Sequence, residues 1–126
     1  MQTFKHRGVA LDSAARTAAP ADTVLDLARY EGLIVVLKVS AGDAGFGLTL
    51  TIKGKDALGN SVNLLSAAQV TAPGTTCYVV HPHATVPAGE GITKASATPL
   101  PQEVALNIAV AGVQSVTYSL CYELIP

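Results

Sequence analysis

The chain has 126 residues and a formal net charge of −1, and its composition is 49% hydrophobic and 13% charged. A single domain of this size buries about two-thirds of its unfolded surface, which is enough for a core without disulfides or metal ions. The low net charge argues against nucleic acid as a partner, because phosphates are held mainly by clustered Lys and Arg. No apolar run reaches membrane-spanning length, and the first residues lack the apolar stretch of a signal peptide. We therefore expect no membrane partner and maturation in a cytoplasm.

The charged fraction is about half of the roughly 25% that is usual for a soluble domain. A surface rich in Ala and Thr would explain this composition without any partner. We favour the alternative, in which other subunits cover much of the surface. Few charges make a small monomer hard to keep dispersed, and the edges of sheets also need cover.

Residues 1–23 differ from the rest of the chain, because they are rich in Ala and keep no period of two. Asp12 or Ser13 could cap a short helix. Such a helix would run through Ala19 and end at Pro20, but its apolar face is too weak for it to be stable alone. We interpret residues 1–23 as an extended N-terminal arm.

Two runs of alternating residues flank a glycine-rich turn at residues 42–47. Successive side chains of a strand point to opposite faces, so each run offers one apolar wall to a core. The pattern predicts a β-hairpin and argues against Rossmann, helical-bundle and P-loop folds. The two walls are formed by Leu33, Val35, Leu37 and Val39 in the first run and by Leu48, Leu50 and Ile52 in the second.

Further strand signals recur from residue 24 to the end of the chain. The stretch 82–102, which holds four prolines, is the longest irregular segment, and loops of this length are usually functional or interfacial. Seven to eight short strands separated by turns predict an all-β fold, a single jelly-roll-like β-sandwich over residues 24–126. Besides the hairpin, we expect strands near 24–29, 62–66, 75–81, 104–110 and 116–124.

Residues that could carry chemistry are sparse. His81 and His83 could face the same way in an extended chain, but a zinc site needs a third and usually a fourth ligand, and no motif supplies them. The chain has no Gly-x-Ser-x-Gly elbow, no catalytic signature around a cysteine and no Trp for a sugar platform. We expect no enzymatic activity, no catalytic residue, no metal site and no cofactor.

The two cysteines, Cys77 and Cys121, both lie in strand-like runs. A disulfide between them is possible if their strands are neighbours. Buried reduced thiols are common, however, and the chain shows no export signal. We favour two free thiols.

Several segments of the chain follow one another in a recognisable order. Residues 30–37 have a Tyr-x-Gly start and a hydrophobic strand, and residues 48–56 read LTLTIKGKD. The segments LLSAA at 64–68, GTTCYVVHP at 74–82 and SVTYSLCYELI near the end come next. This order resembles that of small tailed-bacteriophage head proteins of the decoration type, and the likeness spans residues 24–126.

The resemblance implies a non-enzymatic virion protein that binds the outside of an assembled phage capsid and stabilises it. Its partners would be the major capsid protein and other copies of itself, in a homotrimer, because such proteins commonly sit at local three-fold positions. It would lie on the capsid exterior after assembly in the host cytoplasm. The alternative is a carbohydrate-binding or host-attachment module of a phage particle, because that class also uses β-sandwiches and the fold does not decide the function.

The arm is the first candidate for the contact with the capsid. It carries an apolar anchor next to basic residues, and several copies per oligomer would offset the entropy that each arm loses on docking, about 1–2 kcal/mol per fixed residue. In the alternative, the loop at 82–102 makes the contact and the arm crosses to a neighbouring subunit or stays disordered. The predicted contact residues are Phe4, Lys5, His6 and Arg7.

Overall fold

The computed structural model describes residues 6–27, 30–84, 91–112 and 114–126. Within these ranges the chain forms nine strands and no helix, and none of it could span a membrane as a helix. The prediction of an all-β sandwich is confirmed. The strands are β1 (His6–Arg16), β2 (Thr23–Asp26), β3 (Gly32–Gly42), β4 (Gly47–Lys55), β5 (Ser61–Ser66), β6 (Gly74–Val80), β7 (Lys94–Ser96), β8 (Glu103–Ala111) and β9 (Val116–Ile125).

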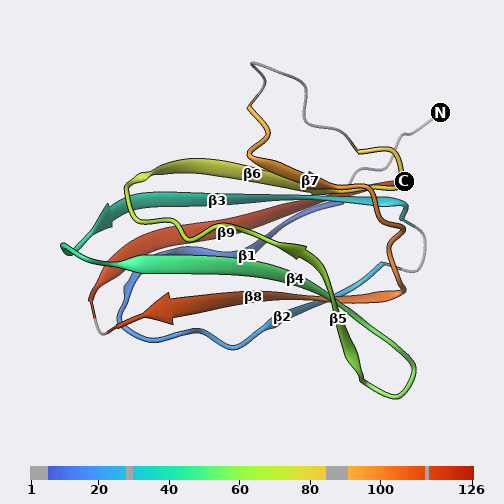
Figure 1. Cartoon of the computed structure of the whole chain (residues 1–126), viewed down its shortest axis with the longest axis horizontal. Helices are drawn as coiled ribbons and strands as arrows, with labels where there is room; N and C mark the ends of the chain where they lie inside the picture. Colours follow the sequence, from blue (N-terminus) through green and yellow to red (C-terminus); the bar gives the residue numbers. More distant parts are fainter. Residues whose placement is uncertain (1–5, 28–29, 85–90, 113) are drawn as a thin grey trace.

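The strands form two sheets that lie one above the other (Figure 1). The five-stranded sheet has the order β1-β9-β3-β6-β7, and the four-stranded sheet has the order β2-β8-β4-β5. The antiparallel pairs β1–β9, β2–β8, β3–β6 and β4–β5 are nested, as if one long hairpin had been rolled into two layers. This nesting defines a jelly roll. Strand β7 is an addition that pairs in parallel with β6.

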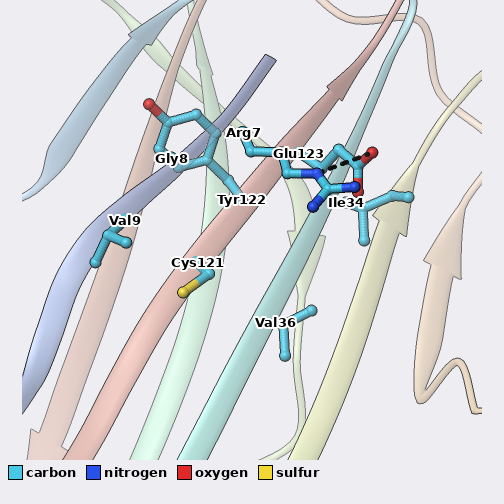
Figure 2. A pocket seen from close by; sticks show the side chains of 8 residues that line it. All are labelled: Arg7, Gly8, Val9, Ile34, Val36, Cys121, Tyr122 and Glu123. Atoms are coloured by element: carbon cyan, nitrogen blue, oxygen red, sulfur yellow. Dashed lines mark ion pairs between the residues drawn. The ribbon is translucent and has the colours of Figure 1, made fainter. Parts of the chain in front are cut away.

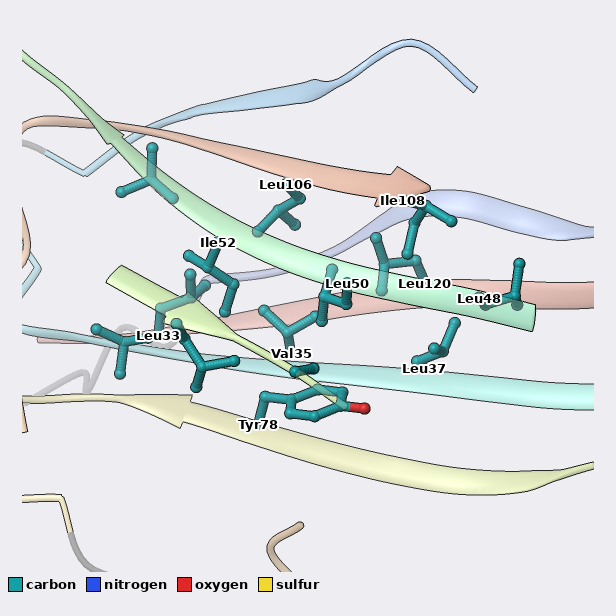
Figure 3. Close-up of a cluster of buried hydrophobic side chains, with 14 of the residues drawn as sticks. Leu33, Val35, Leu37, Leu48, Leu50, Ile52, Tyr78, Leu106, Ile108 and Leu120 are labelled. Atoms are coloured by element: carbon teal, nitrogen blue, oxygen red, sulfur yellow. The ribbon is translucent and has the colours of Figure 1, made fainter. Parts of the chain in front are cut away.

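The core lies between the two sheets, where the inner faces of β3 and β4 meet (Figure 3). Along both strands, buried residues alternate with partly exposed ones, as a period of two requires. Full burial of one Leu or Ile side chain stabilises the fold by about 1.5–3 kcal/mol. Every residue predicted for the two apolar walls is at most 2% exposed: Leu33, Val35, Leu37, Val39, Leu48, Leu50 and Ile52.

The first strand corrects one prediction from the sequence. No helix runs from Asp12 or Ser13 to Ala19, because residues 12–16 belong to β1, which pairs with β9 from its start to its end, and residues 17–19 form no regular element. The register of β1 against β9 shifts twice, between Val9 and Leu11 and again between Leu11 and Ala14. These irregularities remove the period of two that would have revealed the strand. Part of the predicted arm therefore lies in the sheet. The division of the chain into an arm at 1–23 and a domain at 24–126 stays a prediction.

The cysteines are both free, as predicted, and the strand order explains why. Val36 of β3 lies opposite Cys77 on one side and opposite Cys121 on the other. Two strand spacings, about 10 Å, therefore separate the cysteines, which is too far for a disulfide. Burial also raises the pKa of the Cys77 thiol, so less of it is in the reactive thiolate form.

The described part of the proline-rich stretch is more ordered than predicted. Strand β7 lies within it, and the backbone N–H of His81 donates a hydrogen bond to the Ser96 carbonyl at 3.1 Å. Lys94 Nζ donates to the Ser66 carbonyl of β5, which ties the edges of the two sheets together. The nine strands exceed the predicted seven or eight because β1 and β7 lie in segments that were expected to hold none.

Candidate functional site

An apolar groove of about 430 Å³ lies on the outer face of the five-stranded sheet, over β1, β9 and β3. The row that crosses it consists of Val9, Cys121 and Val36, which lie opposite one another on the three strands. Figure 2 shows these side chains on one face of the sheet. The groove is lined by Arg7, Gly8, Val9, Ile34, Val36, Cys121, Tyr122 and Glu123.

The sequence of β3 explains why this outer face is apolar. The strand begins GLIVVL, so aliphatic residues occupy both parities rather than one. Leu33 and Val35 fill the core, while Ile34 and Val36 face outward and are half-buried. A strand that is hydrophobic on both faces is typical of a sheet covered on both sides. This signal was present in the sequence, but the prediction used only the inward parity.

Charge lies at one end of the groove. Arg7 Nε lies 3.9 Å from Glu123 Oε1, and the Arg7 side chain is 79% exposed. An ion pair this exposed contributes little to stability, typically 0–1 kcal/mol. The guanidinium carries five N–H donors on a mostly exposed side chain, so Arg7 is placed to contact a partner that enters the groove.

The N-terminal half of β1 needs a glycine at the groove. The ring of Tyr122 lies against Gly8, the residue opposite it in the ladder (Figure 2). A Cβ atom at position 8 would lie within 2.3 Å of the Tyr122 hydroxyl oxygen, so any side chain there would force the ring to move. The absence of a side chain at position 8 leaves the space that the Tyr122 ring occupies.

The C-terminal half of β1 is fixed by a different device. Arg16 Nη2 donates a hydrogen bond to the Asp12 carbonyl at 2.6 Å, and Nη1 donates to the Tyr118 carbonyl at 2.8 Å. The guanidinium also lies 4.7 Å from the centre of the Tyr118 ring. Burial raises the pKa of the Tyr118 hydroxyl, and the positive charge of Arg16 opposes that rise. Backbone carbonyls in this half are thus engaged within the chain.

The structure brings one of the four predicted contact residues, Arg7, to the groove. His6 opens β1 opposite Leu124. Phe4 and Lys5 lie outside the described residues. The role of all four as partner contacts stays a prediction.

The structure places no further metal ligand beside the histidine pair among the residues that it describes. The backbone N–H of His83 donates to Nδ1 of His81 at 3.1 Å, which occupies one of the ring nitrogens. The two rings are 5.9 Å apart between centroids. Across the described residues, no group of three or more His, Cys, Asp or Glu side chains is placed to hold a metal ion.

Comparison with known proteins identifies the architecture alone. No family model and no curated protein matches the sequence. The chain is similar to a chain in the structure of infectious bursal disease virus, Gx strain, with a TM-score of 0.50 and 16% identity. The match covers 96% of this chain and 32% of the viral one, so this chain spans about a third of the length of its neighbour. At this identity the likeness supports the jelly-roll fold and nothing finer.

Proposed function

We propose that this chain is a virion structural protein that binds the outside of an assembled phage capsid and stabilises it. The observation that carries the proposal is the apolar groove on the outer face of a rigid jelly roll. Contiguous apolar surface on a small protein is commonly a binding site for another protein. A solved structure to which the fold is similar comes from a virus, which agrees with a role in the virion.

The proposed partner is the major capsid protein, and the proposed location is the capsid exterior after assembly in the host cytoplasm. Both follow from the resemblance to decoration proteins. A capsid offers the same surface many times, so a homotrimer could engage several sites at once and bind tightly through contacts that are individually weak.

The proposed role is structural and not enzymatic. Asp56 illustrates how the described carboxylates are used: its two oxygens accept hydrogen bonds from the backbone of Leu58 and from the backbone and side chain of Asn60. These bonds hold a turn. They also hold the pKa of Asp56 below its ordinary value, with the side-chain bond from Asn60 as the largest cause.

The alternative function, a carbohydrate-binding or host-attachment module, has less support. Sugar sites usually present an exposed aromatic ring as a stacking platform. Among the described residues, Tyr78 and Tyr118 are buried in the core, Tyr30 is half-buried and packs against that core, and Tyr122 is half-buried against Gly8. The described residues therefore offer no exposed aromatic platform.

The proposal is tested by mixing the purified full-length chain with expanded, empty capsids of a related phage. We expect the chain to sediment with the capsids, to saturate a fixed number of sites and to raise the temperature at which the capsids fall apart. Capsids that bind no chain at saturating concentration, or that bind it without any gain in stability, would contradict the proposal.

A further inference from the structure

The turn between β4 and β5 is held rigidly. Asp56 Oδ1 accepts hydrogen bonds from the backbone N–H groups of Leu58 at 2.9 Å and Asn60 at 2.8 Å. Its Oδ2 accepts a third bond from the Asn60 side chain, also at 2.9 Å. Gly59 has a φ of 84°, a left-handed conformation that favours glycine. The turn is therefore ordered by its own residues before any partner arrives.

This rigid turn presents an apolar side chain to solvent. Leu58 is 88% exposed, more than any other large hydrophobic residue that the structure describes, and Val62 at the start of β5 is 64% exposed. Turn tips normally carry Gly, Pro, Asn, Asp or Ser, and Asp56, Gly59 and Asn60 of this turn follow that rule, whereas Leu58 does not. A preorganised apolar anchor loses little entropy on binding, so more of its contact energy remains as affinity.

A hollow of about 370 Å³ lies beside the same hairpin. Its floor includes Gly54, where an added Cβ would lie 2.8 Å from Cγ of Pro101 and close to Leu64. The hollow thus forms where a segment of the proline-rich stretch packs on the end of the four-stranded sheet. Its lining is mostly apolar: Gly54, Lys55, Asp56, Val62, Leu64, Pro99, Leu100 and Pro101.

We propose that Leu58 of one copy of this chain seats in this hollow on another copy. Charge complementarity selects a second copy as the occupant. Lys55 and Asp56 lie on the rim of the hollow and also directly precede the turn that carries Leu58. A cation and a carboxylate therefore lie beside the anchor of one copy and beside the hollow of the next. In the contact, Lys55 of one copy meets Asp56 of the other.

Leu58 does not itself line the hollow, although Lys55 and Asp56 adjoin both surfaces, so the contact can join copies head to tail. Such contacts close into a ring when the rotation between copies is suitable. This contact would form the interface between subunits of the proposed homotrimer. Only that assignment rests on the proposed function. It uses a different end of the molecule from the groove over β1, β9 and β3.

The first test places a photo-reactive amino acid at position 58 of the full-length chain. An equimolar mixture of unlabelled and ¹⁵N-labelled chains distinguishes cross-links between copies by their mixed isotope pattern. We expect mixed cross-links to residues that line the hollow, at 54–56, at 62 and 64, or at 99–101. Cross-links confined to one chain, or mixed cross-links to other regions, would overturn the inference.

The second test measures self-association of the full-length chain by sedimentation equilibrium, with no photo-reactive amino acid in the chain. We expect Leu58→Ser and Val62→Ser each to weaken association by about tenfold or more, as loss of an interface anchor does. Val9→Ser is the matched control, because Val9 is also exposed (58%) but lies in the groove. Circular dichroism checks that each variant is folded.

The outcomes separate this inference from the proposed function. A wild-type chain that stays monomeric at every concentration, or a Leu58→Ser variant that associates normally, overturns the contact between copies. A chain that self-associates through Leu58 but never binds capsids supports the inference and contradicts the proposed function.

Discussion

The two sheets of this jelly roll present different outer faces. On the five-stranded sheet, Ile34, Val36 and Cys121 face outward around the apolar groove. On the four-stranded sheet, the outward parity of β4 carries Thr49, Thr51 and Lys53 instead. Both sheets bury an apolar inner face, so the difference concerns the side that faces away from the core.

The difference indicates which side a partner covers. A threonine face is adequately solvated, and a short Asn107–Asp22 hydrogen bond of 2.7 Å adds to its polar character. An aliphatic face gains free energy when it is covered, about 25 cal/mol for each Å² of apolar surface removed from water. Two valines make the comparison testable, because Val9 on β1 and Val24 on β2 are both 58% exposed on edge strands of opposite sheets.

The largest expected effect comes from a charge placed in the groove. We expect Val9→Asp to weaken capsid binding by about 30-fold, because burial of an unpaired carboxylate against apolar side chains costs roughly 2 kcal/mol or more. Val24→Asp on the other sheet should leave binding unchanged. Co-sedimentation with capsids over a range of concentrations measures both variants. If the two substitutions weaken capsid binding equally, the capsid does not bind one outer face in preference to the other.

The next effect concerns stability and separates the two halves of β1. Arg16→Ala removes the bonds to the Asp12 and Tyr118 carbonyls and the contact with the Tyr118 ring. We expect a loss of about 1–2 kcal/mol in the free energy of unfolding, measured in urea. Amide hydrogen exchange should rise in residues 12–16 first, while capsid binding stays close to normal. An unchanged exchange rate there would show that Arg16 does not hold this half of the strand.

A smaller effect is expected at the charged end of the groove. Arg7→Ala should weaken capsid binding by about three- to tenfold, and the loss should shrink as salt is added. The free energy of unfolding should change by less than about 0.5 kcal/mol, because the ion pair with Glu123 is exposed. Lys53→Ala on the four-stranded sheet is the control and should bind normally. A loss that is independent of salt would argue against an electrostatic role.

The smallest effect is a pH dependence confined to the β4–β5 turn. The pKa of Asp56 is lowered from its ordinary value of 3.8, so its stabilising bonds are fully present above pH 3.8. They are lost as the pH falls through the lowered pKa. We expect faster amide exchange at Leu58 and Asn60 in that acidic range, relative to neighbouring strands. In Asp56→Asn the same amides should show no such transition, and a transition that persists would assign it to another group.

The sequence predicted the core better than the edges. In β3 and β4 one parity is apolar without interruption, from Leu33 to Val39 and from Leu48 to Ile52, so these inward residues could be assigned before the structure was known. In β1 the period is lost at two register shifts, and only the ladder to β9 shows that the segment is a strand. Strand β7 has three residues within a proline-rich stretch, too few for any period to be visible.

Part of the candidate site could have been predicted from the sequence. The outward residues Ile34 and Val36 could have been recognised, because β3 is apolar at both parities. The groove itself could not, since it needs the order β1-β9-β3, which places Val9 and Cys121 beside Val36. The same strand order was needed to separate Cys77 from Cys121.

A side-chain-resolution map of capsids decorated with the full-length chain tests most directly which face is covered. We expect capsid protein over the outer face of β1, β9 and β3, in contact with Val9, Val36 and Cys121, while Thr49 and Thr51 face solvent. A map in which the outer face of the four-stranded sheet meets the capsid, and the groove is open to solvent, would contradict the proposed binding surface.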